Sequence, residues 1–218
     1  MDDKIGEEIE AVTGIERVKT NDIVLEGGSI ELDSDRTMIA TESAILNNNR
    51  NPKISNHEFE SLINQYMPID HFIWLKGRKN WDITDFHIDG FVKFLDNKTI
   101  VTMKPDDLYD WGLTDKDIDI LMSAKNRKGE RYNFEYLPLT SKNVKLNSGK
   151  NLKYKGSYIN YYVTNEKVLV PNYHDKNDKV ANEFIQKLYP NKKVIGIDVR
   201  ELYKNGGMIH CVTQQEPK

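Results

Sequence analysis

Residues 22–41 read Asp-Ile-Val-Leu-Glu-Gly-Gly-Ser-Ile-Glu-Leu-Asp-Ser-Asp-Arg-Thr-Met-Ile-Ala-Thr. Residues 22–25 and 29–32 are predicted to be extended, and the polar run at 33–35 is typical of a turn. Residues 36–41, with the apolar Met38 and Ile39, are predicted to return as a second strand. The stretch therefore predicts a unit that opens with strands joined by a tight turn.

The sequence beyond this stretch predicts a helix and a closing strand. Ser55 and Glu58 have the spacing of a capping box, which predicts a helix over about 55–66 that Pro68 ends. Its apolar residues fall on one helical face. Residues 71–75 are predicted to be a buried strand, so the unit has the order strand, strand, helix, strand.

The same order recurs twice, with a period of about 68 residues. The second unit has strands over 90–95 and 99–102, a helix that starts after Thr114, and a closing strand over 133–139. The third has strands over 158–164 and 167–170, a helix around 180–188, and a closing strand over 194–198. Residues 140–156 are predicted to be a loop insertion. Units of this kind pack around an axis or along a line, because one unit alone cannot bury its apolar face.

Polar residues mark the predicted strand ends: Glu26 in the first unit, His87 and Asp89 at the second, Asn160 in the third, and Cys211 at a final strand stub. Equivalent strand ends in a ring meet at a common centre, so these side chains are candidates for one site. Cys211 follows two glycines and a histidine, a pattern that favours a nucleophile, whereas a cysteine that only fills the core is the alternative. His57, His71 and His174 have no comparable neighbours and are predicted to be structural or exposed.

Composition sets further bounds. A chain of 218 residues with 38% hydrophobic and 30% charged residues can bury one substantial core or two small ones. One cysteine excludes an internal disulfide and favours a reducing, cytoplasmic setting; no signal peptide or membrane-spanning stretch is visible. The net charge of -3 gives no electrostatic case for nucleic acid. No metal or cofactor is expected, because metal-ligand spacing and a nucleotide-binding glycine loop are both missing from the sequence.

Four ordered motifs resemble the agmatine deiminase family and the related Porphyromonas-type peptidylarginine deiminases. They are residues 25–30 with 49–52, residues 84–89, residues 158–162 and residues 206–215. The resemblance implies a pentein-type α/β propeller of ββαβ modules. It also implies hydrolysis of a guanidinium group through a covalent cysteine intermediate, with agmatine as the first substrate and peptidyl or free arginine as the rival.

The resemblance assigns roles by motif. Cys211 would attack the guanidinium carbon, His87 would act as general acid and base, Glu26 would orient His87, and Asp89 would hold the guanidinium. Asn160, Gly207 and Phe86 match further positions at the substrate. We expect three departures from the family pattern to change the shape of the pocket. They are Phe86 in place of a glycine, Gly90 after Asp89, where larger residues are common, and Asn205 in place of the first glycine of a triplet. Phe86 in particular would narrow or reshape the substrate channel.

Residues 1–21 lack the earlier family modules and their tryptophan and Arg-Asp motif; residues 1–11 predict only a short amphipathic helix. We therefore expect residues 1–218 to form a single catalytic domain with an incomplete ring of about three modules and a closing strand. Such a ring exposes strand edges, which favours self-association into a homo-oligomer. A non-catalytic remnant of the family is the alternative from another functional class.

Overall fold

The computed structural model describes residues 4–18, 20 and 23–215, and the strands in this part of the chain form three three-stranded sheets. The first sheet contains β1 (Ile30–Leu32), β2 (Thr37–Thr41) and β3 (His71–Leu75). Strands β1 and β2 pair antiparallel, whereas β2 and β3 pair parallel. The chain crosses between β2 and β3 through α2 (Glu42–Ile45) and α3 (Asn56–Tyr66), so this unit has the predicted ββαβ order.

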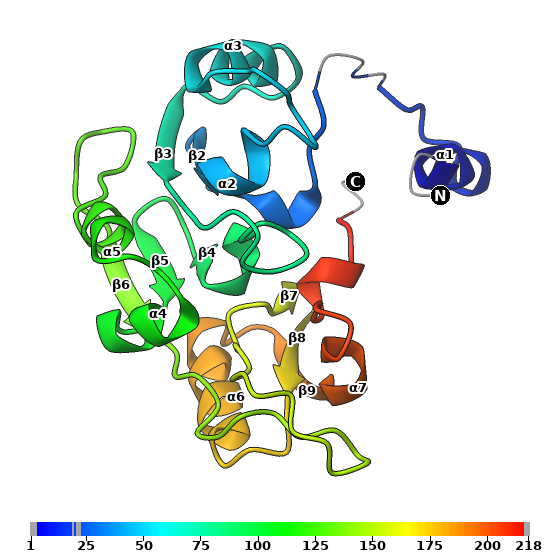
Figure 1. The fold of residues 1–218 in the computed structure, drawn as a ribbon, viewed down its shortest axis with the longest axis vertical. Helices are drawn as coiled ribbons and strands as arrows, with labels where there is room; N and C mark the ends of the chain where they lie inside the picture. The colour runs from blue at the N-terminus through cyan, green and yellow to red at the C-terminus, as the bar shows by residue number, and fades with distance from the viewer. Residues whose placement is uncertain (1–3, 19, 21–22, 216–218) are drawn as a thin grey trace.

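The second and third sheets repeat this pairing pattern. The second holds β4 (Val92–Phe94), β5 (Thr99–Thr102) and β6 (Asn133–Tyr136), with α4 (Pro105–Trp111) and α5 (Asp115–Met122) in the crossover. The third holds β7 (Tyr162–Val163), β8 (Lys167–Asn172) and β9 (Lys193–Asp198), with α6 (Asn177–Leu188) in the crossover. Figure 1 shows the three units following one another around the molecule, from the top through the left to the bottom.

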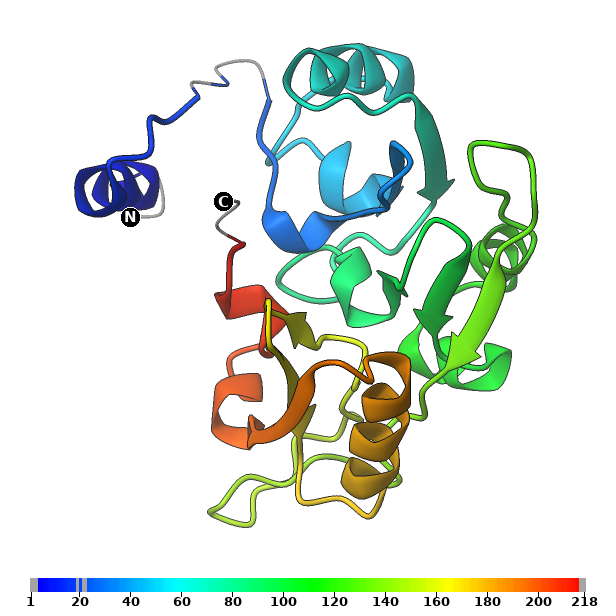
Figure 2. The same ribbon diagram turned by 180° about the vertical axis from the view of Figure 1, so that it is seen from behind.

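The remaining elements are short. Three 3-10 turns, η2 (Gly27–Ser29), η3 (Ile88–Gly90) and η4 (His210–Val212), lie close to one another, and α7 (Arg200–Tyr203) precedes the last of them. Helix α1 (Ile5–Thr13) has no buried residue, and it lies apart from the sheets in both views (Figures 1 and 2). None of the helices in the described part of the chain combines the length and the apolar character that crossing a bilayer requires.

Two clusters of buried side chains form the core. The larger one joins all three units and includes Ile73 of the first, Ile100 of the second, and Tyr158 and Val168 at the third. The smaller one lies inside the first unit, where Met38 and Ala40 of β2 pack with Phe59 and Ile63 of α3. Residues 140–156, the predicted insertion, contain no helix or strand, although Val144 and Leu146 are buried.

Local signals in the sequence set the helix starts. Ser55 accepts a hydrogen bond from the Glu58 amide, and the Glu58 carboxylate in turn accepts one from the Ser55 amide, which confirms the predicted capping box. Thr114 caps α5 by accepting from the Asp117 amide, as predicted. These side chains satisfy amide groups that the first turn of a helix otherwise leaves without partners.

The prediction of a strand over 22–25 is wrong for its described residues 23–25, and Asp22 lies outside the described residues. The strand prediction over 158–164 is wrong for 158–161, where the buried chain is irregular, and β6 ends at Tyr136 instead of residue 139. Cys211 does not end a strand stub, because it lies in the 3-10 turn η4. The functional residues are therefore carried on turns and loops beside the strands.

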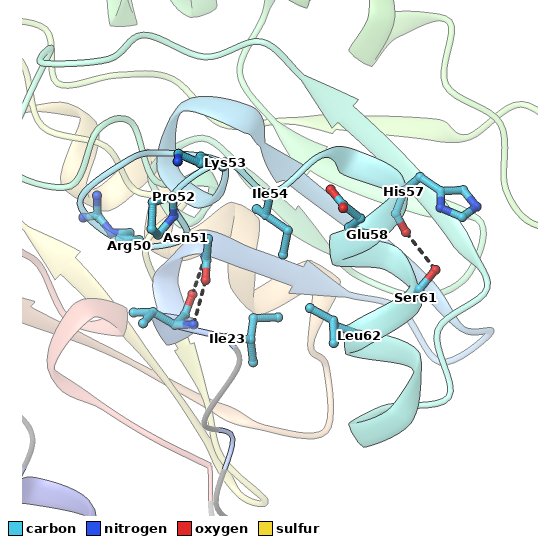
Figure 3. A pocket seen from close by; sticks show the side chains of 11 residues that line it. Ile23, Arg50, Asn51, Pro52, Lys53, Ile54, His57, Glu58, Ser61 and Leu62 are labelled. Atoms are coloured by element: carbon cyan, nitrogen blue, oxygen red, sulfur yellow. Dashed lines mark hydrogen bonds between the residues drawn. The ribbon is translucent and has the colours of Figure 1, made fainter.

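The segment 23–25 pairs with a side chain instead of with a neighbouring strand. The carboxamide of Asn51 accepts from the Val24 amide at 2.8 Å and donates to the Val24 carbonyl at 2.8 Å, as a neighbouring strand would. It also donates to the Ile45 carbonyl at 2.9 Å. Figure 3 shows this pair of bonds beside the surface cavity that Ile23, Lys53 and α3 line. Asn51 thus fixes the segment that leads into Glu26.

We predict that Asn51→Ala lowers the free energy of unfolding by about 1–3 kcal/mol, because the buried Ile45 carbonyl and the partly buried backbone groups of Val24 lose their partner. Urea denaturation would measure the change. The matched control is Asn48→Ala, since Asn48 is exposed three positions away on the same loop, and it should change stability by less than about 0.5 kcal/mol. Equal effects of the two substitutions would contradict the role of Asn51.

Candidate active site

Four predicted residues come together where the 3-10 turns meet. Glu26 precedes η2, His87 precedes η3, Asp89 lies within η3, and Cys211 lies within η4. A cavity of about 700 Å³ is lined by His87, Asp89 and Cys211. Its walls also include the aromatic residues Trp81, Trp111, Tyr154 and Tyr203. Two turns from separate parts of the chain, η3 and η4, thus bring an imidazole, a carboxylate and a thiol to one cavity.

Glu26 binds His87. The distance from Glu26 Oε2 to His87 Nε2 is 3.0 Å, and the His87 side chain is only 12% exposed. The hydrogen bond from His87 lowers the pKa of Glu26 to about 2; partial burial opposes this, and the nearby Arg50 guanidinium adds to it. Glu26 is therefore ionised at neutral pH and can orient the imidazole and stabilise its protonated form.

Arg50 connects Glu26 to a second carboxylate. Its guanidinium hydrogen-bonds Glu26 through Nε and lies 2.9 Å from Asp85 Oδ2 through Nη1. Asp85 is buried, and it also accepts from Asn47 Nδ2 and from the Asn80 amide, each at 2.7 Å. Burial alone would raise the pKa of Asp85, but these hydrogen bonds hold it below its usual range. Arg50 and Asp85 thus form a charged support beneath the Glu26 and His87 pair.

The two residues before His87 have a strained backbone. Asp85 has φ 59° and Phe86 has φ 81°, a left-handed conformation that is uncommon for a residue with a bulky side chain. Thr41 Oγ1 donates to the Phe86 carbonyl at 2.8 Å, and Ser43 Oγ donates to the Asp85 carbonyl at 2.7 Å. Strained conformations persist where the surroundings hold them, and here they fix the point from which His87 extends.

Cys211 lies between Asp89 and Asn160. Its Sγ is 3.6 Å from Asp89 Oδ2 and 3.3 Å from Asn160 Nδ2, which also donates to the Asp89 carbonyl. Although Cys211 as a residue is exposed, the poor solvation of its thiol and then the Asp89 charge raise the thiol pKa to about 11. Without a bound ligand the thiol is therefore protonated at neutral pH.

Gly28 allows the imidazole and the acid to approach each other. A Cβ atom at this position would lie 2.7 Å from His87 Nδ1 and 2.8 Å from Asp89 Oδ2. Both distances are too short for a real contact, so any side chain would displace one of the two groups. The close approach of η2 to η3 depends on this glycine.

Phe86 is in a different place from the one predicted. Its side chain is 2% exposed and packs against Phe91 and Trp81, with ring centroids 5.3 and 6.4 Å away, and it does not line the cavity. The expected narrowing of the channel is therefore not seen, and the departure from glycine acts on the backbone conformation instead. Gly207 packs close to Cys211, since a Cβ there would lie 3.3 Å from Cys211 Cβ.

The other two departures do lie at the cavity. Gly90 and Asn205 both line it. A Cβ at Gly90 would approach the Trp111 ring to 3.1 Å, so a larger residue would move this part of the wall. Within the part of the chain that the structure describes, no cluster of three His, Cys, Asp or Glu side chains has the arrangement of a metal site.

Sequence reasoning assigned no role to three residues that support the site: Arg50, Asp85 and His210. Arg50 lies in a quoted motif, and Asp85 and His210 directly precede assigned positions, but their contacts join positions 24, 35 and 121 residues apart. The signal that the sequence offered for these three residues was their position within or next to a motif. The residues that they contact could be identified only in the folded structure.

Comparison with known proteins gives the family. The model of the Porphyromonas-type peptidyl-arginine deiminase family matches residues 1–217. The agmatine deiminase of Ectopseudomonas mendocina is 31% identical over 232 residues, which cover 99% of this chain and 63% of that protein. The solved agmatine deiminase of Enterococcus faecalis superposes with a TM-score of 0.86 at 29% identity, covering 100% of this chain and 64% of that one.

A cysteine-to-serine variant of the C. jejuni agmatine deiminase, solved with substrate bound, superposes with a TM-score of 0.79 at 27% identity and covers 98% of this chain and 62% of that one. The chain thus spans a little under two thirds of the length of these relatives. The match of the family model over nearly every residue places the chain, with its α/β fold, in the Porphyromonas-type peptidyl-arginine deiminase family.

Proposed function

We propose that this chain carries the chemical site of a deiminase that hydrolyses a guanidinium group. The observation that carries the proposal is the meeting of the Cys211 thiol, the Asp89 carboxylate and the His87 imidazole at one cavity, with Glu26 behind the imidazole. A guanidinium is a poor electrophile, because its charge is spread over three nitrogens. Carboxylates can hold and polarise it with charge-assisted hydrogen bonds.

The first half of the proposed reaction forms a covalent intermediate. When the cationic substrate binds, the Cys211 thiol loses its proton to solvent. The resulting thiolate attacks the guanidinium carbon, and a C–S bond forms. His87 donates a proton to one nitrogen, the C–N bond breaks, and ammonia leaves. What remains on the enzyme is a thiouronium group. Glu26 stabilises the protonated imidazole before the transfer, since its own pKa of about 2 keeps it ionised.

The second half returns the free thiolate. His87 accepts a proton from water, and the resulting hydroxide attacks the thiouronium carbon. The C–S bond breaks, the hydroxyl proton of the tetrahedral adduct passes to solvent, and the product is a ureido compound. Asn160 and Gly207 do not line the cavity themselves, and they are proposed to shape the substrate position through Cys211. Asn160 Nδ2 lies 3.3 Å from Cys211 Sγ, and Gly207 leaves room beside Cys211, because a Cβ there would lie 3.3 Å from Cys211 Cβ. No metal or cofactor enters any of these steps.

Agmatine is the substrate we propose first, giving N-carbamoylputrescine and ammonia as a step toward putrescine. The agmatine deiminases of Ectopseudomonas mendocina and Enterococcus faecalis support this choice by their similarity to the chain. Peptidyl or free arginine is the second candidate, because the matching family model is described as a peptidyl-arginine deiminase. The two candidates share the thiol chemistry and differ in what the cavity accepts beyond the guanidinium.

We predict that Cys211→Ala abolishes turnover and leaves substrate binding intact, because the substitution removes the nucleophile while Asp89 remains. A colorimetric assay for the ureido product, with agmatine, free arginine and an arginine peptide offered in parallel, measures turnover and identifies the substrate class. Calorimetric titration measures binding. Turnover retained by Cys211→Ala would refute the assignment, and an inactive parent protein on all three substrates would favour the non-catalytic alternative.

We predict that Glu26→Gln lowers kcat by about 100-fold, because a neutral amide orients His87 without stabilising its cation. The folded-state pKa of Glu26 is lowered to about 2, so its charge is present throughout the range from pH 5 to 9 and is lost only as the pH falls toward 2. Because the variant lacks the charge that stabilises the protonated imidazole, its kcat–pH profile should show a larger defect at pH 9 than at pH 5, where protons are more abundant. Exposed Glu166 provides the control substitution, Glu166→Gln, and a defect that is larger at pH 5 than at pH 9 would contradict the role.

A further inference from the structure

His210 contacts the substrate-binding carboxylate but has no role in the reaction proposed above. Its Nδ1 atom lies 2.9 Å from Asp89 Oδ2, and the side chains of His210 and Asp89 are 11% and 3% exposed. A carboxylate this deeply buried needs a donor to remain ionised. Among the described residues, the side chains that hydrogen-bond it are those of His210 and Cys211.

These two donors differ in strength. The Cys211 Sγ is 3.6 Å from Asp89 Oδ2, and a thiol is a weak donor. The imidazole N–H is a good donor at a good distance, and a hydrogen bond to an ionised acceptor is stronger than a neutral one. Because the carboxylate can only accept, the contact requires the proton of His210 to be on Nδ1.

The backbone of His210 is held separately from its side chain. The His210 amide donates to Asn160 Oδ1 at 2.9 Å, and Asn160 Nδ2 contacts the Cys211 Sγ at 3.3 Å. Substituting the imidazole therefore removes the contact with Asp89 and leaves in place the contacts that hold η4 against Asn160. This separation makes the function of the side chain testable.

We propose that His210 is a positioning residue. Its Nδ1–H fixes the orientation of the Asp89 carboxylate for guanidinium binding and reduces the effect of the Asp89 negative charge on the neighbouring Cys211 thiol. The part that concerns the guanidinium rests on the proposed function. The part that concerns the thiol does not, because it follows from one oxygen atom, Asp89 Oδ2, lying beside both Nδ1 and Sγ.

Removing the donor has two consequences. Asp89 Oδ2 then acts on the thiol with its full charge, which disfavours the thiolate and slows alkylation of Cys211. The carboxylate is also free to rotate, so it binds a guanidinium less well. Asparagine can return a donor to the position of Nδ1, whereas glutamine extends its amide toward the position of Nε2.

The test measures the iodoacetamide alkylation rate of Cys211, the single cysteine, against pH in the parent protein and in His210→Ala, His210→Asn and His210→Gln. His210→Ala and His210→Gln should react about tenfold more slowly at neutral pH, one unit of thiol pKa being a tenfold change in thiolate. His210→Asn should react at nearly the parent rate. The control His57→Ala, at an exposed histidine away from the cavity, should match the parent.

Steady-state kinetics with agmatine supply the second readout. His210→Ala should raise KM about tenfold with a smaller change in kcat, and His210→Asn should recover most of the loss. If the parent protein alkylates as expected but turns over neither agmatine nor free arginine nor an arginine peptide, the proposed function fails while the alkylation series still decides the role of His210. Equal or faster alkylation of His210→Ala would overturn the proposal. Should that variant not fold, equal rates for His210→Asn and His210→Gln would do so.

Discussion

The buried carboxylate of Asp85 is the group on which the geometry of the site depends. It is 6% exposed and binds the Arg50 guanidinium, the Asn47 amide and the Asn80 backbone amide. Through Arg50 it supports Glu26, and through its own strained backbone it sets the start of His87. Removing one partner of a buried carboxylate costs more free energy than the loss of a single hydrogen bond, because its charge is then left unpaired. One carboxylate thus supports both Glu26 and His87, although it does not contact the imidazole.

The sequence predicted the features that depend on near neighbours in the chain. The caps at Ser55 and Thr114 involve a residue and the amide three positions later, so composition and spacing suffice. The failed strand at 23–25 has the apolar pattern of a strand, but its backbone partner is the side chain of Asn51, 27 positions away. The candidate site shows the same division. Ordered motifs were enough to propose Glu26, His87, Asp89 and Cys211, whereas the supporting contacts of Arg50 and His210 arise only when the three turns meet.

Phe86 illustrates how a residue that departs from a family motif can act on the backbone conformation although its side chain does not line the cavity. A glycine adopts a φ of 81° without strain, and a phenylalanine does not. The side chain is instead buried beside Phe91 and Trp81, so aromatic packing offsets the cost of the backbone conformation. Trp81 also lines the cavity. The packing of Phe86 against Trp81 therefore links the strained turn to the wall of the cavity, although Phe86 itself does not line the cavity.

The charges around the cavity differ in how well they are balanced, and this difference bears on the ionisation of the Cys211 thiol. Arg50 compensates the charge of Glu26, whereas the side chains of the described residues that hydrogen-bond Asp89 are the His210 imidazole and the Cys211 thiol itself. Poor solvation of the thiol, and after it the negative charge of Asp89, raise the pKa of Cys211 to about 11. A guanidinium bound to Asp89 would neutralise that charge and place a positive charge near the sulfur, and both effects favour the thiolate. The thiolate would then form with the substrate in place, and the empty site would keep the less oxidisable thiol.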